Sequence, residues 1–135
     1  MKTFHLEILT PERPFYIGDC SSLVVPLADG LFGILADHAP FTAALVPGEV
    51  AFTAADGSRR VCAIASGMVD ISRSDVKLLC EKALSPAEID EEKERIAAEQ
   101  ARVKMQRRQS RKDYMLSQLA FSRAVSNLRV KKHYN

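Results

Sequence analysis

The first 84 residues alternate apolar and polar positions in short runs. Such alternation predicts strands with one buried face and one wet face. Turn-forming residues separate the runs at positions 10–14, 29–30, 47–48 and 56–57. Many short strands at this spacing favour an all-β sandwich or flattened barrel. The alternating apolar positions are Phe4, Leu6 and Ile8; Leu23, Val25 and Leu27; Val50 and Phe52; Val69 and Ile71; and Val76, Leu78 and Cys80.

The rest of the chain has the pattern of helices. All six glycines and all six prolines lie at or before position 86, so nothing after it breaks a helix. Ser85 and Glu88 form a capping box around Pro86, which predicts a helix from there to about Arg107. Ser110, followed three residues later by an aspartate, opens a second helix that we expect to end near Lys131. The fold class is therefore α+β by segregation, with a β domain over 1–84 and a helical hairpin over 85–135.

The predicted hairpin has little apolar surface with which to hold itself together. The first helix carries a thin stripe of mostly small residues, whereas the second is richer in large ones. Contacts between small side chains bury little area, at about 25 cal/mol per Å². The link over 108–112 has no glycine or proline and could itself become helical. We expect hairpin and extended rod to differ by only a few kcal/mol, roughly the range over which a switch operates.

Charge separates the same two parts. Residues 1–84 carry 7 Lys and Arg against 10 Asp and Glu, whereas residues 85–135 carry 12 against 7. The basic residues gather around the predicted hairpin tip. Three interpretations account for this cluster: a solvated tip, docking to an acidic protein surface, and nucleic-acid binding. No aromatic residues are interleaved with these basic residues, and the β domain is acidic. Both observations argue against nucleic-acid binding. The basic set is Arg102, Lys104, Arg107, Arg108, Arg111 and Lys112.

The sequence carries no pattern typical of an enzyme. Its three cysteines are far apart and lack metal-ligand spacing, so we expect buried thiols and no metal. His38 has no nucleophile or second ligand near it in the sequence, and no phosphate-binding glycine loop is present. A small β-sandwich enzyme is a further alternative, and the absence of any acid–base, metal or nucleophile constellation in the sequence argues against it. No run is long enough to span a bilayer, and the first residues lack the apolar core of a signal peptide.

Several blocks follow one another along the chain: TFHLEI (3–8), TPER (10–13), GLFGIL (30–35), HAPF (38–41), SGMVDI (66–71) and LRV (128–130). Together these blocks resemble a known family, the epsilon subunits of F-type ATP synthases. The resemblance covers nearly the whole chain in order, and its most specific part is the glycine-rich block at 30–35 with the His-Ala-Pro block that follows. It implies a β-sandwich of about ten strands, a helix-turn-helix, and a non-catalytic place on the rotor of a bacterial enzyme.

The resemblance also implies partners and contact residues. The β domain would bind the gamma subunit and stand on the c-ring, with Leu31, Phe32, Gly33 and His38 in the contact loop. Position 31 is often Glu in bacterial relatives and is Leu31 here. The helices would extend toward the α/β hexamer, where the basic residues would meet an acidic β-subunit segment and inhibit ATP hydrolysis. The protein would lie at the cytoplasmic face of the plasma membrane, attached only through the complex, without a signal or transit peptide.

A regulatory ATP site is the remaining implication. Some relatives bind ATP through an I-D-x-x-R-A motif and two arginines on the second helix. The corresponding residues here are Ile89, Asp90, Lys93 and Arg123. Lys93 replaces the arginine of the motif and lacks its bidentate fork for phosphate, while Glu94 replaces the alanine and Asn127 the second arginine. We therefore expect no required cofactor and treat regulatory ATP as a hypothesis.

Overall fold

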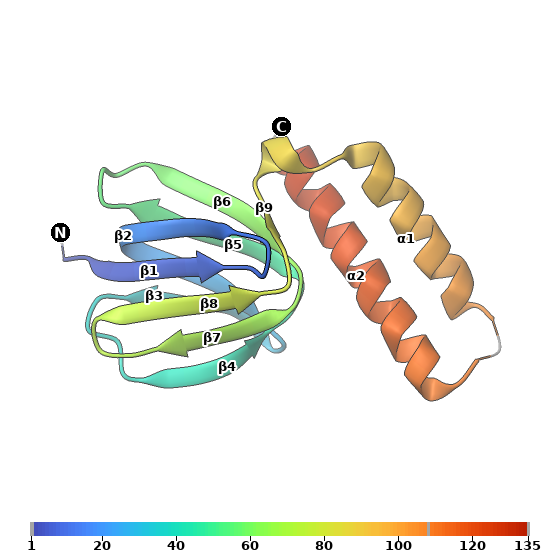
Figure 1. Ribbon diagram of the computed structural model, residues 1–135, viewed down its shortest axis with the longest axis horizontal. Helices are drawn as coiled ribbons and strands as arrows, with labels where there is room; N and C mark the ends of the chain where they lie inside the picture. Colours follow the sequence, from blue (N-terminus) through green and yellow to red (C-terminus); the bar gives the residue numbers. More distant parts are fainter. Residues whose placement is uncertain (1, 108, 135) are drawn as a thin grey trace.

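The computed structural model describes residues 2–107 and 109–134, over which nine strands precede one short 3-10 helix and two α-helices (Figure 1). The sheet domain and the helical hairpin lie side by side, and α2 is the helix nearer to the sheet. The elements are β1 (Phe4–Leu9), β2 (Pro14–Leu27), β3 (Gly30–Leu35), β4 (Phe41–Leu45), β5 (Gly48–Ala54), β6 (Arg59–Ile64), β7 (Gly67–Ile71), β8 (Asp75–Cys80), β9 (Ala83–Leu84), η1 (Pro86–Glu88), α1 (Glu91–Met105) and α2 (Arg111–Tyr134).

The strands form one open sheet that curves around the larger of two apolar clusters. Its order is β4-β7-β8-β1-β2-β5-β6-β9, with β3 paired to β2 outside this path. The β1–β8 pair is parallel and all other pairs are antiparallel. The alternating positions of the sequence point inward, because side chains of a strand alternate between its two faces. Leu6, Ile8, Val50 and Leu78 are fully buried in this core.

The strand count is nine over the described residues, where about ten were expected. The strand β2 runs unbroken for 14 residues from Pro14. Its first half pairs with β1 and its second half with β3 and β5, and the register with β5 shifts between Cys20 and Ser22. The predicted turns at 29–30, 47–48 and 56–57 are confirmed as connections between strands.

The start of the first helix was predicted wrongly. The Ser85 box caps the 3-10 helix η1, and α1 begins five residues later than expected, after Asp90. Ile89 separates the two, with an extended backbone at ψ 123° and a side chain that is only 3% exposed. The side chain packs with Ala63 of β6 and Val130 of α2. Burial of Ile89 against the sheet therefore interrupts the helix that the capping box predicted.

The second helix begins where the sequence indicated. The Ser110 Oγ accepts a hydrogen bond from the Asp113 N–H at 3.1 Å, and α2 continues to Tyr134, three residues beyond the expected end. Ala101 is the buried residue of α1, whereas Leu116 and Leu119 of α2 are exposed. Weak packing of the two helices against each other stays a prediction.

Candidate partner-binding surfaces

An aromatic cluster lies where β3 leads into β4. The Phe32 ring stacks on Phe41 with 5.1 Å between centroids and meets the His38 ring edge-on at 5.4 Å. His38 Nδ1 donates a hydrogen bond to the Ala39 carbonyl at 2.9 Å, which fixes its ring. The chain reaches His38 through Asp37, whose φ of 63° is unusual for a residue other than glycine. Phe32 and His38, two of the predicted contact residues, therefore lie together.

The other two predicted contact residues face away from this cluster. Leu31 and Gly33 lie on the opposite face of β3 from Phe32, because neighbouring residues of a strand point to opposite sides. Leu31 is 74% exposed and lines a cavity of about 860 Å³ together with Val24 and Pro26 of β2 and Phe121 and Val125 of α2. The four residues therefore do not share one face of β3, and their contact with a partner stays a prediction.

The predicted basic residues do surround the hairpin tip. The connection between the helices covers 106–110, and Lys104, Arg107, Arg111 and Lys112 are exposed around it. Arg102 is held by Glu99 on the same helix, with its Nε 3.0 Å and its Nη2 2.6 Å from the two carboxylate oxygens. This hydrogen bond lowers the pKa of Glu99. Arg108 lies outside the described residues. The tip offers exposed positive charge at the point of the molecule furthest from the sheet (Figure 1).

The residues predicted for ATP have internal contacts of their own. Ile89 is buried, and the Asp90 carboxylate caps α1 by accepting the Lys93 N–H at 3.1 Å. Arg123 of α2 lies 3.8 Å from Glu81 in the loop between β8 and β9. Asn127, at the position of the second arginine of ATP-binding relatives, is buried. The geometry thus gives three of the four predicted positions a structural role and leaves the Lys93 side chain exposed.

Sequence reasoning missed an apolar row on the outer face of the sheet. Ala44 of β4 pairs with Met68 of β7, Met68 with Leu79 of β8, and Leu79 with Leu9 of β1. We call these four residues the outer row. Met68 is 44% and Leu79 is 53% exposed, although both occupy positions where the alternation predicts polar side chains. That mismatch with the pattern was the signal, since exposed apolar patches mark interaction sites.

The three cysteines of the chain lie in the interior of the sheet domain. Cys20, Cys62 and Cys80 are buried as expected, and burial raises the pKa of Cys20 and of Cys80 to about 12. A protonated thiol is a poor nucleophile. Within residues 2–107 and 109–134, no cluster of His, Cys, Asp and Glu is arranged to hold a metal ion. In the same residues, no helix has the length and apolarity needed to cross a membrane.

Comparisons with known proteins agree along the whole chain. Residues 3–86 match the family described as "ATP synthase, Delta/Epsilon chain, beta-sandwich domain". The ATP synthase epsilon chain of Caldanaerobacter subterraneus subsp. tengcongensis is 35% identical over 98% of this chain and 96% of its own length. The "ATP synthase epsilon chain, sodium ion specific" of Propionigenium modestum is 30% identical over 99% and 97%. A chain in the mitochondrial ATP synthase of Euglena gracilis has the same fold, with a TM-score of 0.79 at 21% identity over 92% of this chain and 78% of that one.

Proposed function

The chain belongs to the ATP synthase delta/epsilon family, in its bacterial epsilon form, and we propose that it is a non-catalytic subunit of the central stalk of an F-type ATP synthase. The observation that carries the proposal is the agreement of both parts, sheet and hairpin, with epsilon chains over 98% of the sequence. The relatives named above are ATP synthase epsilon chains, and they give no support to the nucleic-acid-binding alternative. The subunit would help to couple ion flow to ATP synthesis and would restrain ATP hydrolysis.

The sheet domain supplies two surfaces that suit a place in a rotor. We propose that the aromatic cluster of Phe32, His38 and Phe41 meets the c-ring, and that the outer row docks on the gamma subunit. The cluster is held rigid by ring contacts, and the row presents Met68 and Leu79 on a firm β-sheet. Rigid exposed apolar groups are the kind that anchor protein interfaces. Attachment to the membrane, at the cytoplasmic face of a bacterial plasma membrane, would then be indirect.

The hairpin supplies the regulatory part of the proposal. Its exposed basic tip would meet an acidic segment of the α/β hexamer when the arm leaves the sheet, and would thereby slow hydrolysis. The small buried side chains of α1 and α2 support an arm that rearranges at modest cost. The epsilon chain of Propionigenium modestum is named sodium ion specific, so the coupling ion differs between relatives. Coupling to protons is therefore part of what we propose for this chain. Regulation by ATP stays a hypothesis, with the internal contacts of Ile89, Asp90 and Arg123 against it.

Reconstitution with gamma and the α/β hexamer tests the proposal. Met68→Gln with Leu79→Gln should weaken gamma binding at least about tenfold, because centrally buried apolar anchors contribute most of an interface. The matched control is Leu35→Gln, which changes an exposed leucine of β3 away from the row. Equal gamma affinity for both variants would overturn the role of the outer row.

The arm is tested in the same complex by charge removal at the tip. Changing Lys104, Arg107, Arg111 and Lys112 to Gln should leave gamma binding intact and relieve inhibition of ATP hydrolysis. The same change at Lys77, an exposed lysine of β8, should leave the hydrolysis rate at the wild-type level. Unchanged inhibition after removal of all four tip charges would refute the inhibitory role.

A further inference from the structure

The cavity of about 860 Å³ between α2 and the sheet has an apolar wall on the sheet side. Val24 of β2 pairs with Ala51 of β5, and Pro26 of β2 pairs with Leu31 of β3, so these four side chains lie beside one another on one face. Val25, between Val24 and Pro26, points into the core on the other face. The strand β2 is therefore apolar on both faces, which is typical of a strand covered on both sides.

The opposite wall of the cavity is one face of α2. Phe121, Val125 and Arg129 line it at a spacing that places them above one another on a helix. Arg123, which was predicted for ATP, lies instead 3.8 Å from Glu81 in the loop between β8 and β9. The cavity is therefore a different place from the predicted nucleotide site.

Charged side chains line the end of the cavity nearest Tyr134. They are Arg59 of β6, Arg129 of α2 and Glu49 of β5, two positive groups against one negative group. The Glu49 carboxylate accepts a hydrogen bond from the Tyr134 hydroxyl at 2.7 Å. This bond raises the pKa of Tyr134, and the nearby Arg59 guanidinium partly offsets the rise. Because a guanidinium binds a carboxylate or phosphate through a fork of N–H donors, this end of the cavity suits an anionic group.

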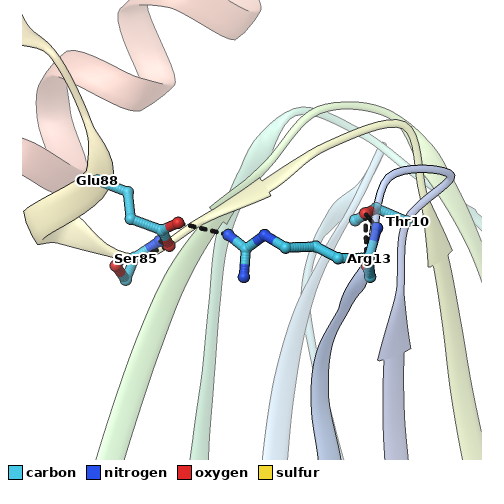
Figure 2. Close-up of polar contacts among 4 residues, drawn as sticks. All are labelled: Thr10, Arg13, Ser85 and Glu88. Atoms are coloured by element: carbon cyan, nitrogen blue, oxygen red, sulfur yellow. Dashed lines mark hydrogen bonds and ion pairs between the residues drawn. The ribbon is translucent and has the colours of Figure 1, made fainter.

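Polar contacts near the end of α2 fix the spacing of the two walls. Lys131 Nζ donates to the Pro86 carbonyl of η1 at 3.1 Å. The helix η1 is fastened in turn, because Glu88 accepts from the Ser85 backbone N–H at 3.0 Å and is paired with the Arg13 guanidinium from the turn between β1 and β2 (Figure 2). In this arrangement the cavity is formed before a ligand arrives, which lowers the cost of binding.

The dimensions of the cavity suit an elongated ligand. Gln118 and Arg129 both line it and lie about 17 Å apart along α2, at about 1.5 Å per residue. Its volume falls within the range of about 300–1,000 Å³ that is typical of ligand sites. Water against the apolar wall of Val24, Pro26 and Leu31 finds few hydrogen-bond partners, so an apolar chain displaces it favourably.

We propose that this cavity binds a single-chain amphiphile with an anionic head, a long-chain carboxylate or alkyl phosphate taken from solution. Arg59 and Arg129 bind the head, and the apolar chain lies along α2 over Val24, Pro26 and Leu31. The site is a property of the isolated chain, so it holds or fails separately from the rotor role proposed above.

Isothermal titration of the full-length chain with dodecanoate, below the concentration at which it forms micelles, tests the site. We expect binding to a single site. Decanoate, which is shorter by two methylenes, should bind about fourfold to fifteenfold more weakly, because full burial of one methylene changes affinity by a factor of about four. Dodecyltrimethylammonium has the same chain with a cationic head and should bind at least about tenfold more weakly than dodecanoate. Equal affinity for the two heads, or no binding of dodecanoate, would overturn the proposal.

Charge removal locates the head of the ligand. Arg59→Gln with Arg129→Gln should weaken dodecanoate binding at least about tenfold. The matched control, Arg60→Gln with Lys132→Gln, removes the same charge at exposed positions of β6 and α2 and should keep the wild-type affinity. Equal affinity for both variants would overturn the site, and circular dichroism confirms that each variant is folded.

Sedimentation with phosphatidylglycerol vesicles separates a free amphiphile from a lipid surface as the ligand. The chain should stay in the supernatant, because the cavity takes one chain from solution. Recovery of the protein with the vesicles, without binding of free dodecanoate, would overturn the proposal in favour of a membrane surface.

Discussion

Replacing Gly67 by alanine should lower the free energy of unfolding by more than the addition of one methyl group usually does. Gly67 opens β7 and lies opposite Cys80 of β8. A Cβ added there would lie 2.2 Å from the Leu79 carbonyl oxygen and 3.0 Å from the Cys80 Cα. Both neighbours are backbone atoms of the adjacent strand, so no side chain can rotate away to make room. The close approach of the two strands is what requires a glycine here.

The geometry sets the size of the effect. A carbon and a carbonyl oxygen in contact lie about 3.3 Å apart, so β7 must draw back from β8 by about 1 Å. Such a movement stretches ladder hydrogen bonds well beyond their usual length of about 2.9 Å. Overpacking costs about 1–3 kcal/mol and each lost hydrogen bond about 1 kcal/mol, so we expect a loss of about 3 kcal/mol. At about 4–8 °C per kcal/mol for a domain of this size, the midpoint of thermal unfolding falls by about 12–24 °C.

Urea and thermal unfolding, followed by circular dichroism, measure this loss. Gly33→Ala is the matched control, because an added Cβ there meets nothing within 4 Å. The control should lie within about 1 kcal/mol of wild type, on the stabilising side, through the entropy of the unfolded chain. If Gly67→Ala unfolds at the wild-type midpoint, or Gly33→Ala is destabilised equally, the argument from close strand approach is refuted.

Three further outcomes follow from the cap, the histidine and the predicted nucleotide residues. His5→Gln should lower stability most below pH 6.5, because the hydrogen bond to Glu7 raises the His5 pKa in the folded state and its contribution fades as pH rises through that pKa; urea unfolding at several pH values measures this. Asp90→Ala removes the N-cap of α1, which should cost about 1 kcal/mol and speed up amide hydrogen exchange along α1; Ser110→Ala is the equivalent change for α2. Isothermal titration with MgATP should show no micromolar binding, since Ile89, Asp90 and Arg123 are engaged within the protein.

Each of these has a contrary result that is easy to recognise. If the difference in unfolding free energy between wild type and His5→Gln did not depend on pH, the charged imidazole would not be stabilised by its carboxylate neighbours. Unchanged exchange in α1 after Asp90→Ala would place the start of that helix elsewhere. A micromolar MgATP signal would restore the ATP hypothesis despite the substitutions at Lys93, Glu94 and Asn127.

The division into a β front and a helical back was available from the sequence, because both signals are local. A period of two identifies a strand such as β1 or β8, and the loss of glycine and proline after Pro86 identifies the helical part. The basic tip was predicted for the same reason, since it depends only on which residues flank the turn at Ser110. The outer row could have been found as well, from Met68 and Leu79 at positions expected to be polar.

Contacts between distant parts of the chain decided the rest. The capping box at Ser85 predicted a helix, but the burial of Ile89 against the sheet and α2 ends that helix after one turn. The tie from Arg13 to Glu88 spans 75 residues and the bond from Tyr134 to Glu49 spans 85. No local pattern encodes such pairs, because each side chain looks like an ordinary exposed residue until folding brings its partner within reach. The sequence determined what the two parts are, and the tertiary structure determined where one is held against the other.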